Sequence, residues 1–161
     1  MAQANSHDVK VLRDLAQHLS DSASGYHDAA EEAQNTRYGP WFEARAAERR
    51  AMAQNLRVEV TQRGGRLEED GSILAKAQRA FTDIKHALLR RDASVIDAVE
   101  SSEDGLKTRF QSAIDDQSLS ATTRETIRRC HAQILAVHDQ MSALKHGLES
   151  QRDADNPLYP R

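Results

Sequence analysis

The sequence predicts an all-α protein in which four long helices pack as a bundle. Two observations carry this prediction. Good helix formers dominate the composition, and the 161 residues include 7 Gly and 3 Pro, too few for a turn-rich β protein. Apolar residues also recur with alternating spacings of three and four, which is the pattern of a helical-bundle seam.

The first helix is predicted over about residues 6–34. Asn5 or Ser6 is expected as its N-cap, because both side chains can accept a hydrogen bond from the first turn. One seam position, Ser22, is polar. The complete seam reads Leu12, Leu15, Leu19, Ser22, Tyr26, Ala29 and Ala33.

The second helix is predicted over about residues 40–63. Gly39 and Pro40 suit a cap followed by the first helical position, and Gly64-Gly65 is expected to end the helix. Its seam is again apolar apart from one central residue, Arg49. The members are Phe42, Ala46, Arg49, Ala53, Leu56 and Val60.

A long connection over residues 64–91 is predicted to carry a short helix of its own, capped by Asp70 or Ser72. The same alternating rhythm continues through this segment. Its apolar members are Leu74, Ala77, Phe81, Ile84 and Leu88. Two short loops and one long crossover are the connectivity of a ferritin-like four-helix bundle.

The third long helix is predicted to start after Asp92, and its seam has one polar member, Glu103. The fourth is expected to begin at a capping box formed by Thr122 and Glu125. These two seams comprise Ile96, Val99, Glu103, Leu106, Phe110 and Ala113, then Ile127, Cys130, Ile134, Val137, Met141, Leu144 and Leu148. A single domain over residues 1–149 and a disordered polar tail over 150–161 are expected.

Composition excludes several classes of function. No apolar run approaches the roughly 20 residues that cross a membrane, so we expect no membrane partner. The formal net charge is -3, and arginine pairs are diluted by acids, so we expect no nucleic-acid partner. Without a signal-peptide pattern, and with Cys130 as the single cysteine, a cytoplasmic protein is expected.

Several segments resemble a known family in the order in which they occur. They are Gly25–Glu31, Phe42–Arg49, Gly71–Leu74, Asp83–Lys85, Glu100–Asp104 and His138–Gln140. Over about residues 9–148 the chain resembles a mostly proteobacterial family of four-helix-bundle proteins of unknown function, grouped with the ferritin-like folds. The resemblance implies the fold and assigns no activity. The family pattern has an acidic residue before the Gly25-Tyr26 pair, where this chain has Ala23 and Ser24.

A ferritin-like bundle raises the question of a di-metal site, which needs Glu-x-x-His on two helices and a Glu on each of the others. That spacing is absent from the sequence. The weak candidates for metal ligands are Glu100, Glu103, His131 and His138, and the weak alternative cofactor is iron or manganese. The two histidines share a column with Arg124 and Lys145, so the alternative is that they are ordinary histidines on a solvated flank.

Ser22, Arg49 and Glu103 form a predicted central polar layer, because each lies near the midpoint of its helix. A buried carboxylate is costly unless paired, and a guanidinium can bind it. The hypothesis is an internal ion pair of Arg49 with Glu103, with a hydrogen bond from Ser22. In the alternative, Arg49 extends its head to solvent and Glu103 lies at the seam edge.

The leading prediction is a non-catalytic protein without a cofactor that acts by binding or assembly. A stress-associated accessory role is part of this prediction. Its partner is an unknown protein or a second copy of itself. The alternative is an atypical ferritin-like metal-binding protein or di-metal oxidase. Apolar residues off the seams, Val11, Val58 and Leu135, suggest a homo-oligomer as a further reading.

Overall fold

A computed structural model describes residues 2–33, 38–67 and 94–154. Four helices lie in these ranges: α1 (Ala2–Glu32), α2 (Tyr38–Gln62), α4 (Ser94–Ile114) and α5 (Ala121–Ala154). No strand occurs within them. The predicted all-α four-helix bundle is therefore confirmed. The expected helix between Leu74 and Leu88, with its cap at Asp70 or Ser72, lies outside the described residues, and so does Asp92.

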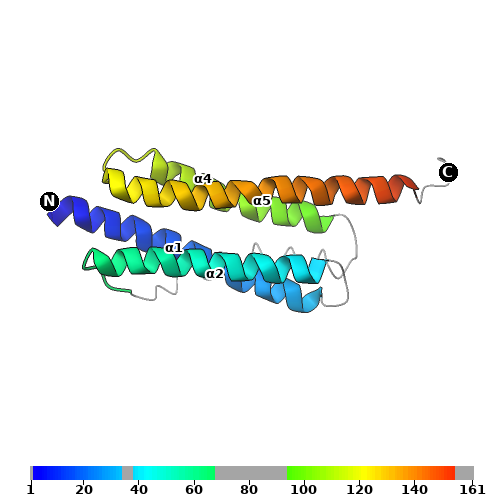
Figure 1. The fold of residues 1–161 in the computed structure, drawn as a ribbon, viewed down its shortest axis with the longest axis horizontal. Coiled ribbons are helices and arrows are strands. Elements are labelled where there is room, and N and C mark those ends of the chain that lie inside the picture. The colour runs from blue at the N-terminus through cyan, green and yellow to red at the C-terminus, as the bar shows by residue number, and fades with distance from the viewer. Residues whose placement is uncertain (1, 34–37, 68–93, 155–161) are drawn as a thin grey trace.

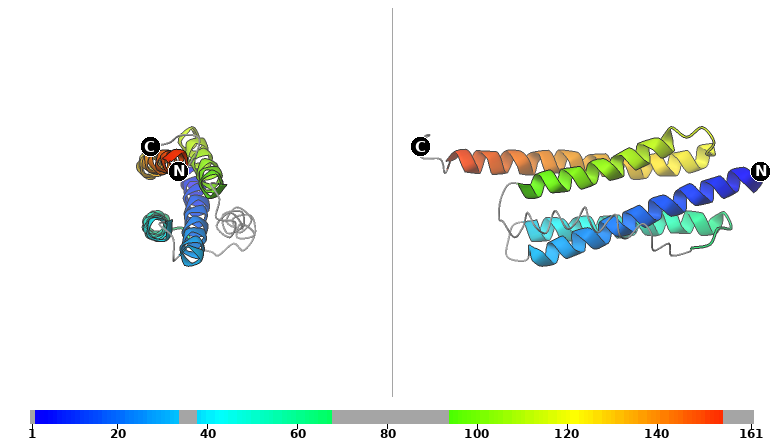
Figure 2. Two further views of the ribbon diagram at one scale, coloured as in Figure 1. Left: turned by 90° about the vertical axis from the view of Figure 1, so that its right-hand side faces the viewer. Right: turned by 180° about the vertical axis from the view of Figure 1, so that it is seen from behind.

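The four helices form two antiparallel hairpins, α1–α2 and α4–α5 (Figure 1). The helices α1 and α5 both start at the same end of the bundle, whereas α2 and α4 run in the opposite direction. As a result, α2 ends at one end of the bundle and α4 begins at the other (Figure 2). The most extensive packing in the described chain is between α1 and α2, and α1 also contacts α4 and α5.

The first two helices start earlier than predicted. Since α1 begins at Ala2, Asn5 lies inside the helix and is not its cap. Its side-chain amide instead donates to the carbonyl of Arg63, at 2.9 Å, and ties the first turns of α1 to the end of α2. The same shift places Ser6 inside α1. Because α2 begins at Tyr38, the expected cap and first helical residue, Gly39 and Pro40, both lie in its first turn.

The end of α2 follows the prediction and has a specific geometry. Gly64 adopts a positive φ of 76°, and its amide donates to the carbonyl of Thr61 at 2.9 Å. The amide of Gly65 donates to the carbonyl of Val60, also at 2.9 Å. These two bonds form a Schellman motif, which satisfies carbonyls that the helix itself leaves unpaired. A Cβ on Gly65 would lie 2.5 Å from the side chain of Val9, so this glycine also allows the chain to pass close to α1.

The last helix has a different cap and a later end than predicted. Ser120 precedes α5, and its hydroxyl oxygen accepts a hydrogen bond from the amide of Thr123 at 3.3 Å. The N-cap is therefore Ser120, two residues before the expected Thr122 of the capping box with Glu125. At the other end α5 continues to Ala154, so the first five residues of the predicted disordered tail are helical.

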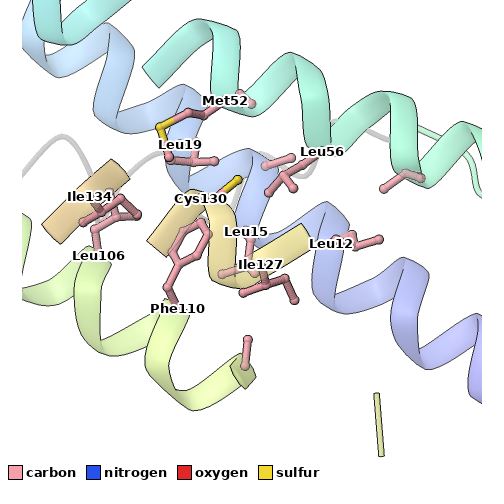
Figure 3. Packing of buried hydrophobic residues seen from close by; sticks show 14 of the residues in the cluster. Leu12, Leu15, Leu19, Met52, Leu56, Leu106, Phe110, Ile127, Cys130 and Ile134 are labelled. Carbon is pink, nitrogen blue, oxygen red and sulfur yellow. The ribbon is translucent and has the colours of Figure 1, made fainter. Parts of the chain in front are cut away.

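The core consists of two clusters of buried residues along the bundle axis. The larger cluster draws side chains from all four helices, with Phe110 of α4 directed toward Cys130 of α5 and Leu15 of α1 (Figure 3). The smaller contains aromatic Tyr26 and Phe42 with Val99 and alanines. The predicted seam residues whose side chains are described are all buried. Repeated alanines on α1 and α2 leave room for these helices to pack closely.

Candidate functional site

A polar layer lies in the centre of the bundle. Arg49 of α2 is fully buried, and Glu103 of α4 is 1% exposed. The Nη2 of Arg49 donates to the Oε2 of Glu103 at 2.7 Å. The two charges therefore face each other in the interior, and the alternative in which Arg49 extends to solvent does not describe this bundle. Such a pair satisfies charges that would otherwise be very costly in the core.

The third member of the layer is Tyr26 of α1. Its hydroxyl donates to Oε1 of Glu103, so both carboxylate oxygens of Glu103 have a donor. Ser22, the residue expected to supply this hydrogen bond, is buried, but the described chain contains no bond from it to Arg49 or Glu103. The position of Tyr26 one turn further along α1 explains the difference: the longer phenol reaches the carboxylate.

The surroundings of the layer keep its neighbours in their neutral forms. Burial, followed by the negative charge of Glu103, raises the pKa of Tyr26 well above its ordinary value. Burial also raises the pKa of the Cys130 thiol to about 11, although the Arg49 charge opposes this shift. The Nη1 of Arg49 lies 3.8 Å from the sulfur of Met52. A buried neutral thiol is a poor nucleophile, so these groups act by packing and hydrogen bonding.

A second polar cluster lies at the end of the bundle where α1 begins. Asp8 of α1 is 3% exposed, and its carboxylate accepts hydrogen bonds from Ser120 and Thr123 at the start of α5. The Ser120 hydroxyl lies 2.6 Å and the Thr123 hydroxyl 2.8 Å from Oδ2. A carboxylate at a helix N-terminus also complements the helix dipole. Next to it, Nε2 of His7 lies 2.7 Å from Oδ2 of Asp116, and this contact lowers the pKa of Asp116.

The weak metal-ligand candidates are not assembled into a site in the described chain. Glu103 is occupied by Arg49 and Tyr26, and Glu100 is partly exposed one turn earlier on α4. His131 is partly buried, and its pKa is lowered by burial and by the charge of Lys107. The side chain of His138 lies outside the described residues. Across residues 2–33, 38–67 and 94–154, no group of three His, Cys, Asp or Glu side chains is placed to hold a metal ion.

Of the three apolar residues predicted to mark an oligomer face, one is partly buried and two are exposed. Val11 is partly buried and packs against the larger core cluster, so it belongs to the fold. Val58 of α2 is 44% exposed and Leu135 of α5 is 40% exposed. These two lie on different helices, and single exposed apolar residues are ordinary on a protein surface.

Sequence reasoning misses two important polar residues, although signals for both are present. The sequence pattern places Tyr26 among the apolar seam residues, but a tyrosine buried at mid-helix needs a partner for its hydroxyl. Asp8 lies four residues before Leu12, where the three-four spacing of the seam continues backward.

The fold and this site define a helical-bundle protein with a buried ionic layer at its centre. A family model described as a domain of unknown function, DUF2383, matches residues 7–116. The chain belongs to this family, which confirms the expected membership in a family of unknown function. The match spans α1, α2 and α4 and stops before α5. No curated protein and no solved structure has significant similarity to the chain. Within the described ranges, no helix is long and apolar enough to cross a membrane.

Proposed function

We propose that this protein is a non-catalytic helical bundle that acts by binding or assembly. The observation that supports the proposal is the central layer, where the Arg49 guanidinium occupies the bundle interior against Glu103 and Tyr26. In di-metal bundles the corresponding interior holds two cations between carboxylates. Here the cation is a side chain of the protein, and the carboxylate has no remaining function as a ligand.

The electrostatics of the layer support the same proposal. A general acid or base needs a pKa near the working pH and access to substrate. Tyr26 and Cys130 are buried, and their pKa values are raised away from neutrality. Groups in these states stabilise a core and do not transfer protons to a substrate.

A cytoplasmic location, a role in stress and a grouping with bacterial ferritin-like proteins belong to this proposal. The single cysteine supports the first. Analogy with ferritin-like proteins supports the second. The two antiparallel hairpins (Figure 1), separated in the sequence by residues 68–93, support the grouping with ferritin-like proteins. The partner class we propose is another protein, including a second copy of this chain.

Elemental analysis of the purified protein, before and after incubation with ferrous iron or manganese, tests the proposal. We expect metal far below one ion per chain in wild type and in Glu103→Gln. Glu125→Gln is the matched control, because Glu125 is an exposed glutamate on α5. Stoichiometric iron or manganese that disappears in Glu103→Gln and persists in Glu125→Gln would establish the alternative, a metal-binding protein.

A further inference from the structure

The bundle consists of two hairpins that are held together by two polar clamps. In the first, donors from both helices of the α1–α2 hairpin, Tyr26 and Arg49, bind the Glu103 carboxylate of the α4–α5 hairpin. In the second, Ser120 and Thr123 at the start of α5 bind the Asp8 carboxylate of α1. Each hairpin therefore supplies one buried carboxylate and the donors for the other.

The apolar core lies between the hairpins in the same reciprocal way. The larger cluster joins leucines of α1 and α2 to residues of α4 and α5, such as Phe110 and Ile134 (Figure 3). Within the described residues, each hairpin buries its apolar stripe against the other. Because each described hairpin covers the apolar surface of the other, the same contacts can form whether the partner hairpin belongs to the same chain or to a second copy.

The length of chain between the hairpins permits this exchange. Residues 68–93 separate the described end of the first hairpin, at Leu67, from the start of the second, at Ser94. With the predicted helix from Leu74 to Leu88 kept, at about 22 Å, and the other 11 of these 26 residues extended to at most about 38 Å, the connection reaches about 60 Å, whereas the 21 residues of α4 span about 32 Å. The connection is therefore long enough to lead from one bundle to a neighbouring one.

We propose that two copies of this protein exchange hairpins, so that α1–α2 of one copy packs on α4–α5 of the other. This inference rests on the proposed function, because it names a second copy as the partner for assembly. The exchanged dimer contains two bundles, each with the described contacts between an α1–α2 hairpin and an α4–α5 hairpin. Its formation is favoured at high protein concentration, and hairpin exchange is a low-cost route to a dimer.

Two single variants of the central clamp provide a complementation test. Arg49→Glu places two carboxylates in the layer, and Glu103→Arg places two guanidinium groups there, so each variant alone is expected to be destabilised and not to form the dimer. When the two are unfolded together and co-refolded, exchange pairs Arg49 with Glu103 in one bundle and their charge-reversed replacements in the other. We expect a heterodimer with twice the 18.0 kDa mass of one chain in light scattering.

The double variant Arg49→Glu/Glu103→Arg in one chain shows whether the reversed pair is tolerated. If this variant folds and the mixture of single variants gives no heterodimer, hairpin exchange is wrong. A second measurement decides the question whatever the double variant does: tagged and untagged wild type are co-refolded at increasing concentration. We expect the amount of untagged chain retained with the tagged chain to rise with the protein concentration during refolding. We also expect it to persist after dilution. Retention that is lost within minutes of dilution, or never occurs, overturns the inference.

The two proposals fail in different experiments. Absence of exchange leaves a non-catalytic protein with a different partner, because the metal content is unaffected. Stoichiometric metal bound through Glu103 rejects the proposed function whatever the oligomeric state. The mass measurement and the elemental analysis therefore test them separately.

Discussion

The substitution Arg49→Leu tests the energetic importance of the central layer. In the wild type, Arg49 is fully buried and its guanidinium pairs with Glu103 at 2.7 Å. Glu103 is 1% exposed in the wild type, so leucine at residue 49 leaves a buried carboxylate with Tyr26 as its remaining donor in the layer. Removal of one partner from a buried ion pair costs about 3–5 kcal/mol. This is a large part of the roughly 5–15 kcal/mol by which domains are stable.

Urea unfolding followed by circular dichroism measures this loss, and thermal unfolding should show a midpoint lowered by about 6–20 °C. Arg129→Leu is the matched control, because the Arg129 side chain is 77% exposed. It should change the free energy of unfolding by less than about 0.5 kcal/mol. An Arg49→Leu protein within about 1 kcal/mol of wild type would refute the reasoning, since it would mean that the charges are solvated.

A double-mutant cycle with Glu103→Leu separates the ion pair from the packing around it. Each single variant leaves one charge of the pair, that of Arg49 or that of Glu103, unpaired in the core. The double variant removes both of these charges. Replacing both partners of a buried pair by apolar residues is often neutral, so we expect the double variant to be more stable than either single one. The remaining cost in the double variant comes from Tyr26, whose hydroxyl loses its acceptor, at about 1–3 kcal/mol.

Three further predictions concern other buried positions. Burial raises the pKa of Asp21, so its charged form is less favourable in the folded than in the unfolded protein, and Asp21→Asn should raise the free energy of unfolding at pH 7. That gain should shrink as the pH falls toward 4, and a pH-independent gain in urea titrations would contradict it. Because the pKa of Cys130 is about 11, alkylation by iodoacetamide at pH 8 should be at least about 100-fold slower in native than in unfolded protein; equal rates would contradict its burial. A Cβ at residue 65 meets Val9, whereas one at residue 105 meets nothing within 4 Å. Thermal unfolding should therefore show Gly65→Ala to be destabilised by about 1–3 kcal/mol and Gly105→Ala to be stabilised by about 0.5–1 kcal/mol; equal effects would be inconsistent with the packing.

The inward faces of the helices can be predicted because burial follows the periodicity of the sequence. Leu12, Leu19, Leu56 and Ile134 are all fully buried, as the three-four spacing indicates. The polar exceptions to the seams are equally informative, because a charged residue in an apolar column must have a partner. This requirement gives the hypothesis of a buried ion pair for Arg49, and the alternative of a solvent-directed head stays open until the guanidinium is seen against Glu103.

Helix ends and the hydrogen bonds between helices cannot be predicted in the same way. The start of α5 depends on Asp8, which reaches Ser120 from a residue 112 positions earlier in the chain. A capping box at Thr122 is a local pattern, and this long-range cap overrides it. Tyr26 supplies the hydrogen bond expected from Ser22 for a similar reason. Which of these two hydroxyls lies beside Glu103 depends on the offset of α4 along α1, and local sequence does not set that offset.

The two clamps explain how this bundle selects one register for its hairpins. Apolar seams with alternating three-four spacing repeat along each helix, so a hairpin shifted by one turn, about 5.4 Å, could still bury many of its apolar side chains. Such a shift would separate Glu103 from Arg49 and leave both charges unpaired in the core, at a cost of several kcal/mol. It would also remove Asp8 from the first turn of α5. Because the clamps lie in the centre and at one end of the bundle, they fix both the offset and the relative direction of the hairpins. The same requirement applies to a hairpin supplied by a second chain, which makes the exchanged partner specific to copies of this protein.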